Sequence, residues 1–409
     1  MGWLKHCFWG LVASGGLYVT ILLALAIPFV QRNATYAHNI NPARWENVSN
    51  VEQYGFVHHQ VQPFTLKSTE NVTLYAWHIL PTHLYRQHRQ ELMEQPNFGL
   101  KPFEEAVNTV GLRLLLGDPE AYTIVSFHGN AGHLASSYRP ATYQQFLSIS
   151  TPQRPVHVIA FDYRGFGVST GFPDEIGVID DGISLLSALC GGPHKYSSLN
   201  RGGLSSALPA LSPGQLILAG QSMGTFISTA SLHEWTVKLG QAPVKALILL
   251  AGFSSLPKLL DSYSIKGLTP PVLSPLTPYP MAQNWFRKLL VDRWDLNSRL
   301  QELLLTEELA LDVTMMHARD DWEIPYREGF VNWQTVEKLV NGTGTLSSTH
   351  DDVMHPEFTR TWESDDGLKQ VRWQKIRHGG HNRIPTSEHL KLTLMDIVNR
   401  PRESFRQQS

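Results

Sequence analysis

Cysteine is scarce in this chain of 409 residues, which contains only Cys7 and Cys190. Cys7 lies inside an apolar N-terminal stretch, so we do not expect a structural disulfide between the two. Neither a C-x-x-C pair nor a Cys/His zinc spacing occurs in the sequence. The fold must therefore be stabilised by core packing, and an apolar fraction of 42% is enough to build a sizeable core.

Charge is also sparse and evenly balanced. The chain carries 34 lysines and arginines against 36 acidic residues, a formal net charge of −2, and no segment holds a dense basic run. Because binding to a phosphate backbone needs clustered positive charge, we expect no nucleic-acid partner.

Charged side chains are absent altogether from residues 7–31. This stretch is long enough to cross the hydrocarbon layer as a helix. Residues 24–26 (Ala-Leu-Ala) resemble the cleavage site of a signal peptide, but the apolar run continues beyond them, so we favour an anchor. The sequence thus predicts a short tail over residues 1–6, a single transmembrane signal-anchor over 7–31 and a juxtamembrane linker over 32–60.

Both an anchor and a signal peptide would carry the rest of the chain across the secretory membrane. Asparagine sequons agree with this, because N-x-S/T marks acceptors for N-glycosylation in secreted domains. The candidates are Asn33, Asn47, Asn71 and Asn341.

From residue 61 onward, short apolar runs alternate with segments that suit helices. Continuous rather than alternating hydrophobicity is typical of strands buried on both faces, as in a parallel sheet. The alternation predicts an α/β fold with a mainly parallel, doubly wound sheet over residues 61–400. The expected runs are 122–128, 156–162, 215–220, 244–252, 311–318 and 371–378.

Three segments interrupt this rhythm. Residues 191–214 and 341–367 are rich in small polar residues and are interpreted as surface insertions. Residues 254–305 contain a proline cluster followed by an amphipathic stretch, and their position between two strands makes them a candidate cap over the active site. Residues 401–409 are expected to form a tail.

The pattern G-x-S-x-G, which forms the nucleophile elbow of serine hydrolases, occurs twice. Ser222 lies between Gly220 and Gly224, after an apolar strand and before a helix-compatible segment, as an elbow requires. Ser169 also matches, but it follows Arg164-Gly165-Phe166 and leads into a proline, which indicates a loop. We therefore predict Ser222 as the nucleophile.

A glycine-rich turn, His128-Gly129-Asn130-Ala131-Gly132, follows the predicted strand at 122–128. Such a turn lets backbone N–H groups point toward an oxyanion. We assign the two donors to Asn130 and to Met223, the residue after the nucleophile, with His128 and Gly129 shaping the turn. The alternative is an ordinary strand-to-helix turn.

In this fold the acid and the base follow the serine in that order. Asp320 and Asp321 close the predicted strand at 311–318, and His381 follows the last strand, with His378 as its rival. A metal site is a further possibility in one loop, although its residues lack rigid helical spacing, so a solvated loop is favoured and we expect no metal or cofactor. That loop contains His350, Asp351, Asp352 and His355.

The motifs FHGNAG, FDYRGFGVSTG, GQSMG and HARDDWEIP together resemble those of membrane-bound α/β-hydrolase-domain lipases of the lysophosphatidylserine lipase and monoacylglycerol lipase type. The resemblance covers about 72–395. It implies Asp321 as the acid, four residues before Pro325, and His381 as the base. It also implies residence in the endoplasmic reticulum membrane with the catalytic domain in the lumen, and a non-catalytic serine at position 169.

The function expected is hydrolysis of carboxylic esters of lipids with one acyl chain, a monoacylglycerol or a lysophospholipid, at a membrane. A serine aminopeptidase-like enzyme or an acyl-protein thioesterase is the alternative, and a non-catalytic hydrolase-fold protein is a third. A basic cap favours an anionic lipid headgroup; its basic residues are Lys258, Lys266, Arg287 and Lys288. Four apolar cap residues either dip into the membrane interface or pack the cap on the sheet, namely Trp285, Phe286, Leu289 and Trp294.

Overall fold

The computed structural model describes residues 2–95, 99–192, 210–264, 269–340, 343–349, 355 and 357–400. Several of the predictions fall outside these residues. They concern most of the 191–214 insertion, the 401–409 tail, Lys266, Asn341, His350, Asp351 and Asp352.

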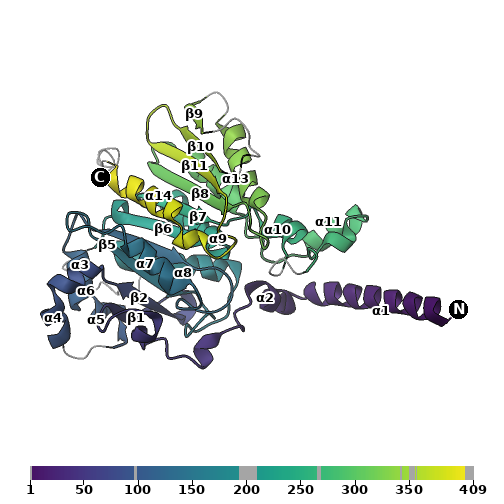
Figure 1. Ribbon diagram of the computed structural model, residues 1–409, viewed down its shortest axis with the longest axis horizontal. Helices are drawn as coiled ribbons and strands as arrows, with labels where there is room; N and C mark the ends of the chain where they lie inside the picture. The colour runs from purple at the N-terminus through teal and green to yellow at the C-terminus, as the bar shows by residue number, and fades with distance from the viewer. Residues whose placement is uncertain are drawn as a thin grey trace.

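One mixed sheet organises the molecule, with the strand order β3-β1-β2-β5-β4-β6-β7-β8-β11-β10-β9 (Figure 1). Its six central strands run parallel to one another, and all of them except β11 are buried along their whole length. These strands are β5 (Val156–Asp162), β4 (Tyr122–Phe127), β6 (Leu216–Gln221), β7 (Ala246–Leu250), β8 (Leu311–Ala318) and β11 (Lys369–Ile376). The predicted α/β class is thereby confirmed.

The two ends of the sheet are largely antiparallel. At one end β1 (Val61–Lys67) pairs with β2 (Thr73–Ile79), β2 pairs with β5, and the short β3 (Lys101–Pro102) runs parallel to β1. At the other end β11 pairs with β10 (Phe358–Glu363), and β10 pairs with β9 (Thr345–Ser348). The prediction of an insertion over 341–367 is wrong for these two strands. Only Phe358 and Trp362 of β10 are buried, so its pattern is too weak to recognise in sequence.

Helices cover both faces of the sheet. On one face α7 (Arg139–Leu147) and α14 (Glu388–Asn399) pack over a core that includes Tyr143 and Leu394 (Figure 1). The opposite face carries α8 (Glu175–Cys190), α9 (Met223–His233), α12 (Leu296–Leu305) and α13 (Tyr326–Leu339). Short helices follow β2, namely α3 (Thr82–Gln87), α4 (Arg89–Glu94), α5 (Phe103–Ala106) and α6 (Val110–Leu116).

The N-terminal helix α1 (Gly2–Leu25) projects from the domain (Figure 1), and among the described residues it is the one helix long and apolar enough to cross a membrane. It ends six residues earlier than expected, because the chain turns and Pro28 begins a new helix, α2 (Pro28–Tyr36). The expected linker over 32–60 is folded against the domain, where Tyr36, Val51 and Phe56 are buried.

The expected cap over 254–305 divides into two parts. Helix α12 packs against α9 and α13 as a member of the helical layer, through buried residues such as Leu300 and Leu303. The part that stands apart from the sheet includes α10 (Leu256–Ser262), the 3-10 turn Ser274–Leu276 and α11 (Pro280–Lys288), which points away from the domain (Figure 1).

Candidate active site

Ser222 occupies the sharp turn between β6 and α9. Its backbone has φ 53° and ψ −121°, a region that costs free energy for a residue with a side chain. The elbow closes only because its flanks are glycines. A Cβ atom at Gly220 would collide with the Gly224 backbone, and one at Gly224 would collide with the Phe127 carbonyl. The spacing of the motif therefore follows from the contact between α9 and the neighbouring strand.

Asp321 and His381 meet in a buried pair beyond the ends of β8 and β11. The His381 Nδ1 atom lies 2.8 Å from Asp321 Oδ2, and the two residues are 9% and 4% exposed. The other carboxylate oxygen accepts the backbone N–H groups of Glu323 at 3.0 Å and Ile324 at 2.9 Å. The carboxylate is thus fixed in place and orients the imidazole ring.

Each member of this pair shifts the pKa of the other. Burial raises the pKa of Asp321, but hydrogen bonds and charges of His317 and His381 outweigh it and hold that pKa well below its ordinary value of 3.8. Burial lowers the pKa of His381, yet the hydrogen bond and charge of Asp321, with the charge of Glu323, leave it above 6.5. The arrangement favours an ionised carboxylate beside a histidine that accepts a proton readily.

The rival residues form a separate pair at the surface. His378 Nδ1 lies 3.4 Å from Asp320 Oδ2, and the His378 side chain is 77% exposed. Asp320 Oδ1 also accepts the backbone N–H of Gly380 at 2.8 Å, which ties down the loop that carries His381. The structure therefore places Asp320 as a support of the His381 loop.

The glycine-rich turn at 128–132 lies directly against the elbow. A Cβ atom on Gly129 would come within 3.3 Å of Ser222 Cβ. The guanidinium of Arg139, in α7, donates to the carbonyls of Gly129 at 2.9 Å and Ala131 at 2.8 Å. Since the Gly129 carbonyl and the Asn130 N–H point opposite ways across one planar peptide, this N–H is directed away from Arg139. The geometry is compatible with the predicted role of Asn130.

His128 is buried beneath the turn, and its contacts hold the turn in place. Its Nε2 atom lies 3.3 Å from Asp162 Oδ1, its Nδ1 atom lies 2.7 Å from the Gly129 carbonyl, and its own carbonyl accepts the Tyr163 hydroxyl at 2.9 Å. These contacts anchor the turn to the end of β5.

Residues from the expected linker complete the turn from the other side. The Asn130 side-chain amide donates to the Thr35 carbonyl at 2.6 Å, and the Gly132 N–H donates to the Ile40 carbonyl at 2.8 Å. No local pattern indicated this contact, because its partners are about a hundred residues apart.

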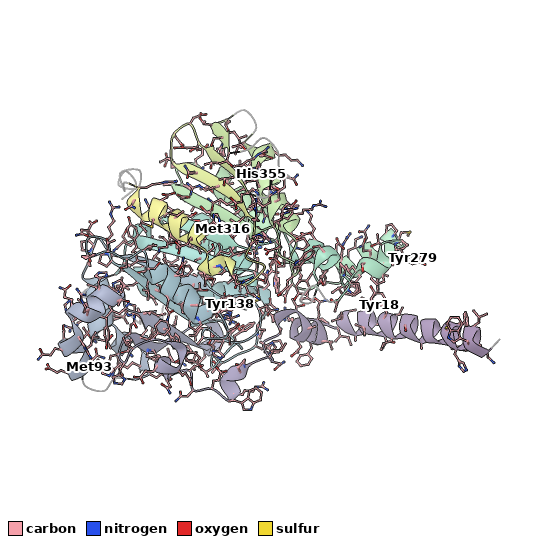
Figure 2. The ribbon with its side chains drawn as sticks, viewed as in Figure 1. Tyr18, Met93, Tyr138, Tyr279, Met316 and His355 are labelled. Carbon is pink, nitrogen blue, oxygen red and sulfur yellow. The ribbon has the colours of Figure 1, made fainter. Side chains whose placement is uncertain are left out.

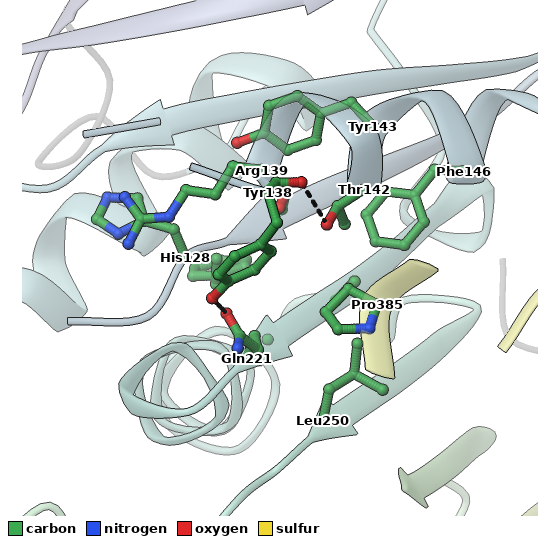
Figure 3. Close-up of a pocket in the computed structure, with 13 residues that line it drawn as sticks. His128, Tyr138, Arg139, Thr142, Tyr143, Phe146, Gln221, Leu250 and Pro385 are labelled. Carbon is green, nitrogen blue, oxygen red and sulfur yellow. Dashed lines mark hydrogen bonds between the residues drawn. The ribbon is translucent and has the colours of Figure 1, made fainter. Parts of the chain in front are cut away.

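A second feature missed in the sequence is a chain of side chains behind the elbow (Figure 3). The Tyr138 hydroxyl donates to Gln221 Oε1 at 2.6 Å, and Gln221 Nε2 donates to the His381 carbonyl at 2.9 Å. The adjoining cavity, lined by Tyr138 and Gln221 among others, has a volume of about 20 Å³, roughly the space of one water. Gln221, the residue before the predicted nucleophile, therefore holds the loop of the predicted base, His381, by a hydrogen bond.

The second G-x-S-x-G match lies in a closed turn after β5. The Ser169 hydroxyl donates to the Asp162 carbonyl at 2.8 Å and accepts the Tyr75 N–H at 2.9 Å. The residue is 9% exposed. Its hydroxyl is therefore occupied in joining β2 to the end of β5.

The candidate glycosylation residues differ in accessibility. Asn47 and Asn71 are exposed. Asn33 is half-buried, and its side-chain nitrogen donates to the Phe29 carbonyl at 2.8 Å.

Comparison with known proteins agrees with this architecture. The alpha/beta hydrolase family matches residues 124–391. The chain is 22% identical over 315 residues to lysophosphatidylserine lipase ABHD12 of Danio rerio, covering 77% of this chain and 68% of that one. It is 23% identical over 340 residues to the protein of the same name from Gallus gallus, covering 82% and 72%. The resemblance to lysophosphatidylserine lipases is thus confirmed.

Among solved structures, an alpha-beta hydrolase from Vibrio vulnificus superposes with a TM-score of 0.51 and 14% identity, over 90% of each chain. This likeness shows the fold alone. The match over residues 124–391, which is more than half of the chain, establishes that the chain belongs to the alpha/beta hydrolase family.

Proposed function

We propose that this protein is a serine hydrolase that cleaves the carboxylic ester of lipids carrying one acyl chain, a monoacylglycerol or a lysophospholipid. The observation that carries the proposal is the buried Asp321–His381 pair, whose loop is tied through Gln221 to the residue beside the Ser222 elbow. A strained serine whose neighbour Gln221 bonds to the loop of an oriented, buried histidine fits the arrangement in which a histidine activates a hydroxyl as a nucleophile.

In the proposed reaction Ser222 Oγ attacks the acyl carbonyl while His381 takes the hydroxyl proton. The backbone N–H groups of Asn130 and Met223 stabilise the oxyanion of the tetrahedral intermediate. His381 then protonates the departing alcohol, and Asp321 holds the histidine in the required tautomer. Water, activated by His381, releases the fatty acid from the acyl-serine.

Two observations support a lipid as the substrate. The relatives named lysophosphatidylserine lipase hydrolyse a lysophospholipid, as their name states. The cap also exposes Lys258 and Lys288. Positive side chains there favour an anionic headgroup over the free amine that an aminopeptidase binds.

We further propose that α1 anchors the enzyme in the endoplasmic reticulum membrane with the catalytic domain in the lumen. The length and composition of α1 support a membrane span. Its C-terminal end packs on the cap through Leu22, which favours a retained anchor over a cleaved signal peptide. Exposed Asn47 and Asn71 support a lumenal domain, and Asn47→Gln with Asn71→Gln should reduce a glycosidase-sensitive mass shift, with Asn33 and Asn341 as the remaining candidates.

The activity is tested with a fluorophosphonate probe on the full chain in detergent. Wild type and Ser169→Ala should be labelled, and Ser222→Ala should not. Because both serines lie in the same pentapeptide pattern, Ser169→Ala is a matched control. Labelling that survives Ser222→Ala would reject the proposal. A panel of lysophospholipid, monoacylglycerol, aminoacyl amide and acyl thioester substrates then assigns the bond that is cleaved.

A further inference from the structure

The part of the cap around α11 exposes large apolar side chains. Tyr279 is 64% exposed, Met281 is 89% exposed and Trp285 is 54% exposed. Of the cap residues expected either to contact the membrane or to pack inward, Phe286 and Trp294 are buried and Trp285 is not. We call residues 272–291 the cap lobe. A cluster of exposed apolar groups of this kind indicates a surface with a partner.

The membrane-anchor candidate packs directly on this lobe. Leu22 of α1 shares a buried apolar cluster with Leu273, Phe286 and Leu290. The Tyr18 hydroxyl donates to the Val272 carbonyl at 3.0 Å. Figure 1 shows α11 projecting on the same side of the domain as α1, and Figure 2 labels Tyr18 and Tyr279 there.

A second set of bonds fixes the end of α1 to the lobe. Gln31 is 3% exposed, and its side-chain nitrogen donates to the Leu25 carbonyl at 2.9 Å and to the Leu289 carbonyl at 3.2 Å. Its side-chain oxygen accepts the Val291 N–H at 2.7 Å. One buried glutamine thus joins α1, α2 and the lobe.

The length of α1 indicates how deep in the bilayer its contact with the lobe lies. Residues 7–25 rise roughly 28 Å as a helix, which only just matches the ~30 Å hydrocarbon layer. Tyr18 lies about 10 Å along the helix from Leu25. If Tyr18 and Leu22 stayed in water, the remaining uncharged helix would be far too short to span. A lobe that contacts Tyr18 must therefore enter the bilayer.

Charge at the base of the lobe, on the end of α11 and on the residues next to the lobe, fits a position at the level of the headgroups. Lys288 and Arg293 are exposed near the end of α11 that faces the domain. Arg287 is ion-paired with Asp261, and the buried carboxylate of Asp292 accepts from Arg32 at 3.3 Å. Exposed cations at the base of an apolar surface are typical of segments that lie in a membrane interface.

We propose that the cap lobe is a lipid-contact surface that enters the leaflet at the C-terminal end of α1, so that substrate reaches Ser222 directly from that leaflet. This rests on the proposed membrane span of α1 and on the proposed lipid substrate. Trp294, three residues beyond the lobe, stacks its ring on Phe226 of α9, the helix that begins after Ser222, so the base of the lobe packs on the element that carries the site.

The depth of the lobe can be measured with single-cysteine variants of the full chain. Cys7→Ser and Cys190→Ser provide the background, and Met281→Cys carries an environment-sensitive fluorophore in phosphatidylcholine vesicles. Doxyl-labelled lipids should quench the fluorophore at position 281. Leu392→Cys, on α14 and 60% exposed, is the control and should remain unquenched. An unquenched fluorophore at 281 would overturn the proposal.

Val12→Cys separates this inference from the anchor on which it depends. Quenching at positions 12 and 281 supports both statements. Quenching at 12 without quenching at 281 rejects the lobe contact and leaves the anchor, whereas no quenching at 12 rejects the anchor itself and with it the lobe proposal.

Activity provides a second readout. The double substitution Met281→Glu with Trp285→Glu should lower the hydrolysis of vesicle-embedded lysophospholipid by about tenfold, because charge opposes insertion. Hydrolysis of water-soluble p-nitrophenyl acetate and fluorophosphonate labelling should stay unchanged. The control is Leu346→Glu with Leu392→Glu, at exposed positions away from the lobe. Equal losses on vesicle lipid in both double variants would contradict the proposal, whereas loss of labelling by wild type would contradict the proposed function instead.

Discussion

Ser222 and Ser169 share the pattern G-x-S-x-G, but their surroundings differ in almost every respect. Ser222 has a positive φ of 53° at the junction of a buried strand and a helix, and its hydroxyl has no hydrogen-bond partner among the described residues. Ser169 lies in a loop and uses its hydroxyl to join Asp162 to Tyr75. Ser222 is thus held in a strained and accessible position, whereas Ser169 is buried and its hydroxyl links two strands.

This difference teaches that the pentapeptide supplies only the small flanking residues. What distinguishes an elbow is the strand before it and the helix after it, together with the groups that other parts of the chain bring to it. Around Ser222 these are the turn at 128–132 and the pair of Asp321 with His381.

The largest effect is expected from the buried acid. Asp321→Asn should lower ester hydrolysis by about 10³-fold or more, because the amide no longer favours the required histidine tautomer or stabilises its charge. Asp320→Asn keeps the hydrogen bond to the Gly380 N–H through its amide oxygen and should cost less than about tenfold. Steady-state hydrolysis of a soluble ester measures both. Equal losses would mean that the buried pair does not serve the nucleophile.

The next largest difference in activity is expected between substitutions of the residues that precede the two serines, Gln221 and Val168. Gln221→Ala removes the bonds to Tyr138 and to the His381 carbonyl, so we expect kcat to fall by about tenfold with little change in KM. Val168→Ala, at the equivalent and exposed position of the second pattern, should leave both parameters unchanged. A pure loss of thermal stability in Gln221→Ala, with normal kcat, would show that the chain behind the elbow is only structural.

The pH profile should report the raised pKa of His381. The base must be neutral to accept a proton, so activity should rise with pH and reach half its maximum above 6.5. The raised pKa also contributes stability that is present below pH 6.5 and is lost as the pH rises through the folded-state value. A rate profile from pH 5 to 9 checks this. His378→Gln is the control, and its profile should match wild type.

The smallest effect on activity is expected at Ser169, where the effect on stability is larger. Ser169→Ala leaves the buried Tyr75 N–H without its partner and should cost about 1–3 kcal/mol of unfolding free energy. Ser222→Ala should be neutral or slightly stabilising, because it removes no hydrogen bond among the described residues and functional sites store strain. Thermal or denaturant unfolding of the two variants measures whether Ser169→Ala loses more unfolding free energy than Ser222→Ala. A larger loss of unfolding free energy in Ser222→Ala would contradict the structural role assigned to Ser169.

Much of the fold could be predicted because the central strands are buried on both faces. Runs such as 156–162 and 311–318 are mostly apolar, and this signal does not depend on distant residues. Strand β10 escaped prediction because only two of its residues, Phe358 and Trp362, are buried in the core, and polar residues lie between them. The packing of the N-terminal region escaped prediction for a related reason, since Gln31 in the expected anchor and Tyr36 in the expected linker look polar and isolated until partners far along the chain bury them.

The sequence by itself determined the order of strands and helices and the residue types of the candidate site, because hydrophobic periodicity and glycine spacing are local properties. Only the tertiary structure decided which groups meet. It set Asp320 on the Gly380 N–H, put Thr35 against Asn130, and set α1 on the cap lobe. These contacts join residues separated by 60 to about 250 positions, and no local pattern encodes a distance that exists only once the sheet has brought its loops to one edge.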